Sequence, residues 1–168
     1  LRSALPARSE MCIRDRVYSG AVGEVKISLD LNMTYLNKYV VNPFPGGAPI
    51  YFDGFIGGGN GGYPKWRGYG VLTAEKDGIS ATWSTQWIGK ATDFNASAGD
   101  IGYRTPNVFY HNLQLAFAID EKTRFQIGAD NLFDRKAPYI QSFTDANTDT
   151  MTYDLLGRRF YAGFRTAF

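Results

Sequence analysis

The stretch Tyr153-Asp-Leu-Leu-Gly-Arg-Arg-Phe-Tyr-Ala-Gly-Phe-Arg-Thr-Ala-Phe168 decides how the whole sequence is interpreted. From Phe160 onward its apolar side chains alternate with polar or small ones, and this period of two indicates a β-strand. A soluble domain gains nothing from an exposed Phe at its end, whereas a membrane-barrel strand faces lipid on one side and a polar interior on the other. One face would hold Phe160, Ala162, Phe164, Thr166 and Phe168, and the other Arg159, Tyr161, Gly163 and Arg165.

Further stretches upstream alternate in the same way. The clearest runs from Val25 to Tyr35, with apolar residues at odd positions and polar residues between them. The face that carries Lys65 and Arg67 is expected to line a polar interior. Each stretch has about the length that a tilted strand needs to cross a membrane. The expected strands are residues 25–35, 65–74, 79–87, 109–119, 124–130 and 160–168.

The connections between these strands alternate in length along the chain. Bacterial outer-membrane barrels join their strands by short periplasmic turns and long extracellular loops, and a soluble sandwich has no reason to sort its loops this way. The pattern predicts an antiparallel meander with the C-terminus on the periplasmic side. The long connections are Asn42 to Pro64, Asp93 to Pro106 and Asp134 to Thr152, and the short ones are Glu75 to Gly78 and Asp120 to Thr123.

Two segments carry a resemblance to a known family. The closing strand and the segment Asn131-Leu-Phe-Asp-Arg-Lys-Ala-Pro-Tyr139 resemble the corresponding parts of TonB-dependent outer-membrane receptors. The resemblance covers residues 23–168. It implies that this all-β chain is the open C-terminal part, about six transmembrane strands, of a barrel of about 22 strands that is filled by a plug.

The resemblance also implies a function and partners. A TonB-dependent receptor lies in the outer membrane of a Gram-negative bacterium and imports scarce ligands such as ferric siderophores, with energy delivered by TonB through an N-terminal plug. Phe160, Phe164 and Phe168 would be read by the barrel-assembly machinery and would then face outer-membrane lipid. The plug and the TonB-contacting segment are not in this sequence, and the transported ligand, a small molecule such as a metal chelate, is not specified by it.

The first 16 residues match nothing downstream in composition or period. The segment Glu10-Met-Cys-Ile-Arg-Asp-Arg16 resembles a translated sequencing adapter, so we expect residues 1–16 to be foreign to the protein and residues 17–168 to be receptor barrel. A genuine basic arm or the end of a signal peptide are the alternatives. No apolar segment follows the arginines, which argues against a signal peptide.

Composition excludes several classes of protein. The sequence has no run of about twenty apolar residues for a transmembrane helix, whereas a strand needs only about ten alternating ones. A net charge of +2 is too small to argue for nucleic acid as a partner. The single histidine, His111, cannot by itself build a catalytic triad or a multi-histidine metal site. We therefore expect no enzyme activity, no cofactor and no resident metal.

The candidate binding residues lie in and near the long loops. Because ligands reach such a barrel from outside, the three long loops defined above should carry the ligand contacts. Acidic loop residues could bind a cation together, although scattered loop acids are usually solvated. These acids are Asp93, Asp100, Asp145 and Asp149, and the aromatic residues expected to form an interfacial girdle are Trp66, Trp87, Phe109 and Tyr110.

Two alternatives remain open at this point. One is another outer-membrane barrel, such as a porin or an adhesin, which would lack the upstream plug. The other is a soluble all-β module that binds carbohydrate and uses Trp66, Trp83 and Trp87 as stacking platforms. Membrane fractionation separates the second alternative from the barrel.

Overall fold

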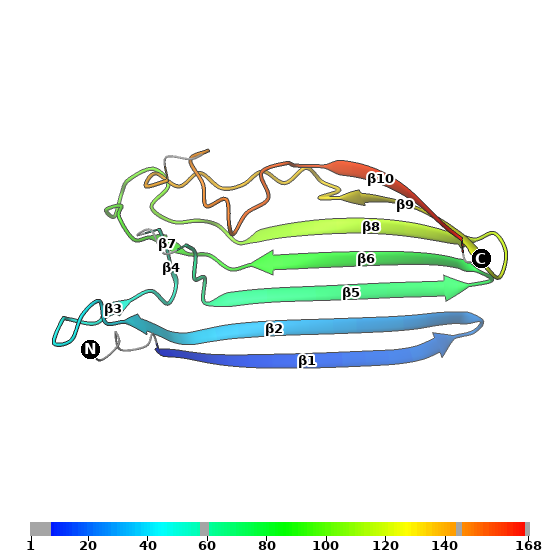
Figure 1. The fold of residues 1–168 in the computed structure, drawn as a ribbon, viewed down its shortest axis with the longest axis horizontal. Coiled ribbons are helices and arrows are strands. Elements are labelled where there is room, and N and C mark those ends of the chain that lie inside the picture. The colour runs from blue at the N-terminus through cyan, green and yellow to red at the C-terminus, as the bar shows by residue number, and fades with distance from the viewer. Residues whose placement is uncertain (1–7, 58–60, 144–145, 167–168) are drawn as a thin grey trace.

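The computed structural model describes residues 8–57, 61–143 and 146–166, and these form an all-β fold (Figure 1). Its main sheet is an antiparallel meander in which the long strands follow one another in chain order. The long strands are β1 (Arg8–Val22), β2 (Val25–Val41), β5 (Trp66–Lys76), β6 (Ile79–Ile88), β8 (Val108–Ala118), β9 (Thr123–Asp130) and β10 (Arg159–Thr166). The short strands β3 (Ile50–Tyr51), β4 (Phe55–Ile56) and β7 (Thr92–Asp93) lie within the long connections.

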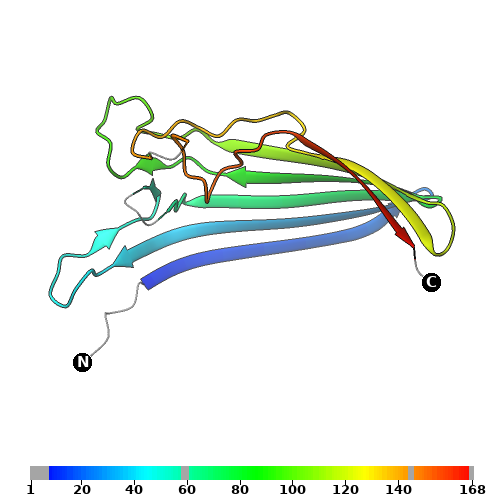
Figure 2. The same ribbon diagram turned by 45° about the horizontal axis from the view of Figure 1, so that its top comes forward.

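The sheet is open. Among the described strands β10 pairs only with β9, β1 pairs only with β2, and no ladder joins the first strand to the last. Figure 2 shows the main sheet as one twisted layer. The prediction of an open antiparallel meander is confirmed, although the sheet holds seven long strands rather than about six.

The register places like side chains in rows across the strands. One row runs from Tyr18 through Leu29, Leu72, Trp83, Leu113 and Ala129 to Phe160, each directly opposite the next. A row on the other face pairs Asp30 with Val71, Val71 with Ser84 and Ser84 with Asn112. Because cross-strand partners share a face, the alternation of each strand adds up to one apolar and one largely polar face.

At several positions in this sheet burial is the reverse of that in a soluble protein, although in the first half of β2 the apolar residues are half-buried and the polar residues exposed. On the apolar face Leu72 is 44% exposed, Phe160 75% and Phe164 66%. On the polar face Ser80 is only 6% exposed and Ser84 9%. A water-soluble sheet normally covers its apolar face with a second layer. Among the described residues no second layer of strands covers this one, although Phe133 packs against Trp83 at its loop end.

The connections are sorted by length between the two ends of the sheet, as predicted (Figure 1). β5 and β6 are joined by Asp77 and Gly78 alone, since Lys76 pairs with Ile79. Both turn residues have positive φ, 51° for Asp77 and 78° for Gly78. This backbone conformation matches the twist of a two-residue hairpin and explains the Asp-Gly sequence. The long connections gather at the opposite end.

The first strand contradicts one expectation. The first expected strand was residues 25–35, yet β1 precedes it and pairs with it from Val22 back to Arg8. The pairing follows because the two-residue turn Gly23-Glu24 folds β1 and β2 into a hairpin. This hairpin extends to residues 8–16, which belong to the segment expected to be foreign.

Within residues 8–16 of β1, the alternation of polar and apolar side chains does not match the two faces of the sheet. Arg14 lies opposite Met33 and Arg16 opposite Leu31, so both arginines fall on the apolar face. Val17 lies opposite Asp30, on the polar face. From Tyr18 onward the phase is correct again, because Tyr18 pairs with Leu29. The mismatch thus ends close to residue 16, where the atypical segment was expected to end.

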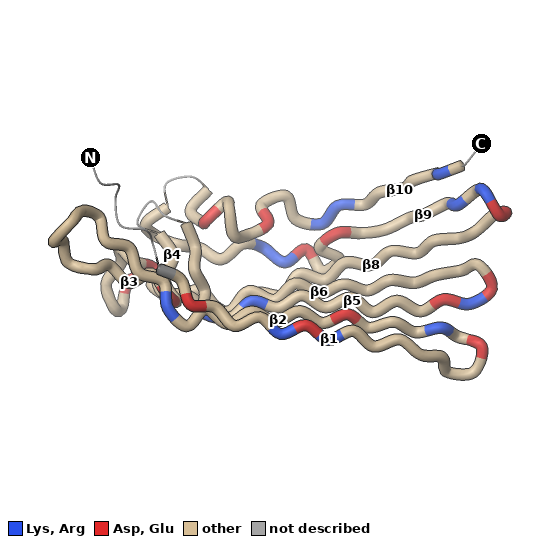
Figure 3. The backbone as a smooth tube through the Cα atoms, turned by 60° about the horizontal axis from the view of Figure 1, so that its bottom comes forward, with Lys and Arg blue, Asp and Glu red and all other residues tan. Residues whose placement is uncertain are grey.

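Charged residues gather toward the ends of β5, β9 and β10, whereas β2 also carries Asp30 in its interior (Figure 3). β6 and β8 contain no Lys, Arg, Asp or Glu, and in β5 these types occur only near its ends, at Arg67, Glu75 and Lys76. No helix in the described parts of the chain is long and apolar enough to span a membrane. Phe168, expected to act as an assembly signal, lies outside the described residues.

Candidate functional site: the loop cap

The three long connections pack together at one end of the sheet and form a unit that we call the loop cap, within residues 42–64, 89–107 and 131–158. The first two connections are joined by the parallel pair β4 and β7. The backbone N–H of Thr92 donates to Gly54 O at 2.9 Å, and that of Phe94 donates to Ile56 O at 2.8 Å. The cap is therefore built by contacts between residues far apart in the sequence.

The third connection is tied to the second through Asp93. The Ser142 hydroxyl donates to Asp93 Oδ1 at 2.6 Å, and the Ser142 N–H donates to Oδ2 at 3.0 Å. A third donor, the N–H of Asn95, reaches Oδ1 at 3.0 Å. Asp93 is 1% exposed. The expectation that the loop acids are solvated is wrong for this residue, because local donors replace its water.

The cap has its own apolar core, which lies against the loop end of the polar face. Val108 and Ile88 come from the strand ends and are 0% and 1% exposed. They pack with Ile56 of the first connection and Ile140 of the third, both 0% exposed. Ala91, Tyr110 and Tyr153 complete this cluster. Burial of this apolar surface is the main driving force that holds the loops over the sheet.

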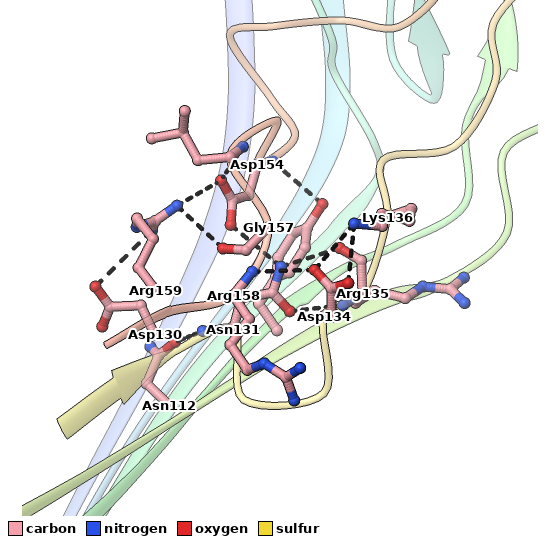
Figure 4. Close-up of polar contacts among 12 residues, drawn as sticks. Asn112, Asp130, Asn131, Asp134, Arg135, Lys136, Asp154, Gly157, Arg158 and Arg159 are labelled. Atoms are coloured by element: carbon pink, nitrogen blue, oxygen red, sulfur yellow. Dashed lines mark hydrogen bonds and ion pairs between the residues drawn. The ribbon is translucent and has the colours of Figure 1, made fainter. Parts of the chain in front are cut away.

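Asn131 anchors the third connection to the sheet (Figure 4). It ends β9 with a φ of 49° and is only 2% exposed. Its N–H donates to Asn112 Oδ1 at 2.8 Å, and its own Oδ1 accepts from Arg135 N at 2.7 Å. Its Nδ2 donates to Arg135 O at 3.0 Å and to Asp154 Oδ2 at 3.2 Å. The side chain thus fixes both the start and the far end of the connection.

Asp154 and Asp134 extend this anchor toward β10 (Figure 4). Asp154 accepts from Arg159 Nη1 at 2.9 Å, and Asp134 Oδ1 accepts from Arg158 N at 3.0 Å. Burial of Asp154 tends to raise its pKa, but hydrogen bonds from Arg159, Leu156 N and Asn131 outweigh burial and lower the pKa. The pKa of Asp134 is lowered chiefly by its hydrogen bond with Lys136.

The cap borders a hollow of about 520 Å³ between the first and third connections. Tyr39 and Tyr63 line it with ring centroids 4.4 Å apart, and Arg67 lies beside them and donates to Gly62 O at 3.0 Å. Burial is the main cause of the raised pKa of Tyr63, so this hydroxyl stays protonated near neutral pH. The hollow therefore offers aromatic surface, hydroxyl groups and a cation to a ligand. Its other lining residues are Ser9, Met11, Thr34, Leu36, Gly61, Pro64, Met151 and Thr152.

The cap also holds polar atoms without a protein partner. Within the described residues, Thr148 Oγ1 and Asp149 Oδ2 are buried and accept or donate no hydrogen bond. Asp149 is 1% exposed, and its other oxygen accepts from Met151 N at 3.0 Å. The expectation of a solvated loop acid is therefore wrong for Asp149 as well. Asp100 is exposed, as expected, and Asp145 lies outside the described residues.

Three of the four expected girdle residues lie together on the apolar face. Trp66, Trp87 and Phe109 form a row at the loop end, with successive ring centroids 6.3 and 6.2 Å apart. Tyr110 does not belong to this row, and that assignment is wrong. It follows Phe109 directly in β8, so it points to the opposite face, where it is 4% exposed and its hydroxyl accepts from Asp154 N at 3.2 Å.

His111 lies at the end of the aromatic row. Its ring centroid is 5.4 Å from those of Trp83 and Phe133, and its Nδ1 lies 2.9 Å from Thr85 Oγ1. No group of three or more His, Cys, Asp or Glu side chains in the described ranges is arranged to hold a metal ion. The contacts of His111 are those of a packed side chain.

Comparison with known proteins adds no relative. No protein-family model matches this chain, and no curated protein or solved structure matches it. The family resemblance of the closing strand and of the Asn131 segment therefore remains a proposal.

Sequence reasoning missed the anchoring role of Asn131 and the burial of Asp93 and Asp149. A signal was present for Asn131, because Asn tolerates positive φ better than most residues and here directly follows a strand. No comparable signal existed for the two acids. Groups that contact or shield them lie in other parts of the cap, and a single sequence does not show these contacts.

Proposed function

We propose that this chain forms part of the transmembrane barrel of a TonB-dependent outer-membrane receptor, with the loop cap on the extracellular side. The observation that carries the membrane location is the exposed apolar face of the sheet, on which Leu72, Phe160 and Phe164 are open to the surroundings. Lipid covers such an apolar face without a second protein layer. The aromatic row at the loop end fits one boundary of that lipid layer, because Trp prefers the interface.

The receptor assignment within outer-membrane barrels rests on sequence. The closing strand and the Asn131 segment resemble this family, and the hydrogen bonds of Asn131 anchor a long connection that this proposal assigns to the extracellular side. Uptake of a scarce ligand such as a ferric siderophore, coupling to TonB through an upstream plug and insertion by the barrel-assembly machinery follow from that resemblance. The hollow beside Tyr63 and Arg67 is the proposed place for ligand contact in this part of the chain.

The membrane location is tested at two adjacent positions of β5. Leu72 lies on the apolar face and Thr73 on the polar face. With the lone Cys12 replaced by Ser, a spin label at Leu72→Cys is expected to be relaxed by oxygen, which concentrates in lipid. The same label at Thr73→Cys should be relaxed by a water-soluble nickel chelate. If the nickel chelate relaxed both spin labels equally in the natively expressed protein, the membrane location would be contradicted.

The ligand function is tested separately at Arg67. Its guanidinium borders the hollow, so Arg67→Gln should weaken uptake of the imported ligand while leaving the amount of protein in the outer membrane unchanged. Lys90→Gln, which changes an exposed cation of the cap outside this hollow, is the matched control. An upstream plug of over a hundred residues in the gene favours the receptor, and its absence favours a porin or an adhesin.

A carbohydrate-binding module is the second candidate, and the aromatic row is the observation that favours it. The ring planes of Trp66 and Trp87 differ by 16° and those of Trp87 and Phe109 by 7°, an arrangement that could stack against sugar rings. This candidate predicts a soluble protein whose Trp fluorescence changes with oligosaccharide. The spin-label experiment separates it from the barrel, because a soluble module leaves Leu72 open to water.

A further inference from the structure

The polar face carries two arginines directly opposite each other near the short-turn end. Arg124 of β9 and Arg165 of β10 are register partners, so their side chains leave the sheet on the same side. Like charges directly opposite each other destabilise a sheet. Among the described residues neither guanidinium takes part in an ion pair. Both side chains are exposed, so water screens part of this repulsion, and a group of opposite charge between them would remove more of it.

Both arginines border one hollow of about 440 Å³. No acid is among its lining residues, so the two guanidinium groups give the lining a formal charge of +2. Glu75, the acid on the same face of β5, lies beyond Ser80 and outside the lining. The rest of the lining is Ser80, Thr82, Gln114, Ala116, Gln126, Gly163 and Phe164.

The polar side chains in the hollow are held in place by one another. Arg124 Nη2 donates to Ser80 Oγ at 2.6 Å, and Gln114 Nε2 donates to Gln126 Oε1 at 2.8 Å. Gln126 lies close over Gly163, where an added Cβ would come within 2.9 Å of Gln126 Nε2. These contacts orient Arg124 and the Gln126 amide before any ligand arrives, which lowers the entropic cost of binding.

We propose that this hollow binds an oxyanion, a carboxylate or phosphate group, between Arg124 and Arg165. Two guanidinium groups offer charge-assisted hydrogen bonds in the geometry that such anions accept, and Gln126 supplies a further neutral donor. The anion cancels the repulsion across the β9–β10 pair and so strengthens the last ladder of the sheet. The oxyanion comes either from a free phosphate ion or from an acidic side chain of polypeptide that contacts the polar face.

The experiment measures the melting temperature of the purified full-length protein. Sodium phosphate is compared with sodium chloride at the same ionic strength, for the wild type and for Arg165→Gln, whose side chain makes no hydrogen bond within the described part of the chain. Lys90→Gln removes an exposed cation that lies outside the hollow and is the matched control. For a free anion, phosphate raises the melting temperature of the wild type and of the control. Arg165→Gln then weakens the apparent phosphate affinity roughly ten- to hundredfold, as expected for one lost charge-assisted contact.

The second source gives a different result. If a polypeptide carboxylate already occupies the hollow, phosphate has no effect on the wild type, but Arg165→Gln lowers the melting temperature well below that of Lys90→Gln. Arg165→Lys, which keeps the charge, then recovers part of the loss. The proposal is overturned if phosphate acts no differently from chloride and Arg165→Gln melts no lower than Lys90→Gln. These outcomes do not depend on the identity of the imported ligand.

Discussion

Ser142 holds the carboxylate of Asp93 with both its hydroxyl and its backbone N–H, at 2.6 and 3.0 Å. The two residues are 49 positions apart and belong to different long connections. Gly57 of the first connection passes beside them, since a Cβ there would come 3.1 Å from Ser142 Oγ and 3.3 Å from Asp93 Oδ1. All three connections therefore meet at this one contact.

Replacing Ser142 by Ala should loosen the cap without unfolding the sheet. The substitution removes one hydrogen bond to a buried carboxylate, which is worth about 1.5–3 kcal/mol. Amide hydrogen exchange in β7 and residues 140–143 should accelerate roughly ten- to hundredfold. Ser97→Ala changes an exposed residue of the same cap and should leave exchange unchanged. Equal exchange in the two variants would mean that the Asp93 contact does not hold the loops together.

Replacing Asn131 by Ala should destabilise the protein more than the same change at Asn147. Both residues have positive φ, 49° and 50°, so the backbone strain imposed by Ala is similar. Only Asn131 is buried and holds the loop through its amide group. We expect a loss of about 1–2 kcal/mol from strain at either site and about 1–3 kcal/mol more at Asn131. Equal denaturation midpoints for the two variants would contradict the anchoring role.

The Asp154 contact should make the loop anchor sensitive to acid. Its pKa in the folded protein is lowered below the ordinary value of 3.8. The carboxylate therefore contributes its full stability above the unfolded-state pKa and loses it as pH falls through the folded-state pKa. Stability of the anchor should decline below about pH 4. Asp154→Asn should remove this part of the acid dependence, and an unchanged pH profile in that variant would contradict the assignment.

Arg14 and Arg16 test whether β1 faces lipid. If the sheet lies in a membrane, each arginine near the midplane of the apolar face costs about 2–4 kcal/mol. Arg16→Leu should therefore raise the denaturation midpoint in lipid bilayers. Asp15→Leu alters the polar face of the same strand and should give no such gain. Without a gain for Arg16→Leu, residues 8–16 do not lie against lipid in the assembled protein.

The sequence by itself determined six of the seven long strands, the face of each side chain in them and the sorting of the connections. A period of two assigns each side chain to a face, and a short turn such as Asp77-Gly78 fixes which residues pair across it. Both signals are local, so they can be read without any knowledge of distant contacts. Across the long connections they assign only the face, and pairings such as Leu29 with Leu72 come from the structure.

Only the tertiary structure decided how the cap is built. Asp93 looked like a solvated loop acid because Ser142 is remote in sequence. Tyr110 looked like a girdle residue because it follows Phe109, but the cap core covers the opposite face at that level. β1 looked foreign to the sheet, yet it pairs with β2 because backbone hydrogen bonds form whatever the side chains are. Pairing of a strand depends on the backbone, whereas the face on which each side chain lies depends on the sequence. In β1 the backbone pairs along the whole strand, but the alternation of side chains matches that of β2 only after about residue 16.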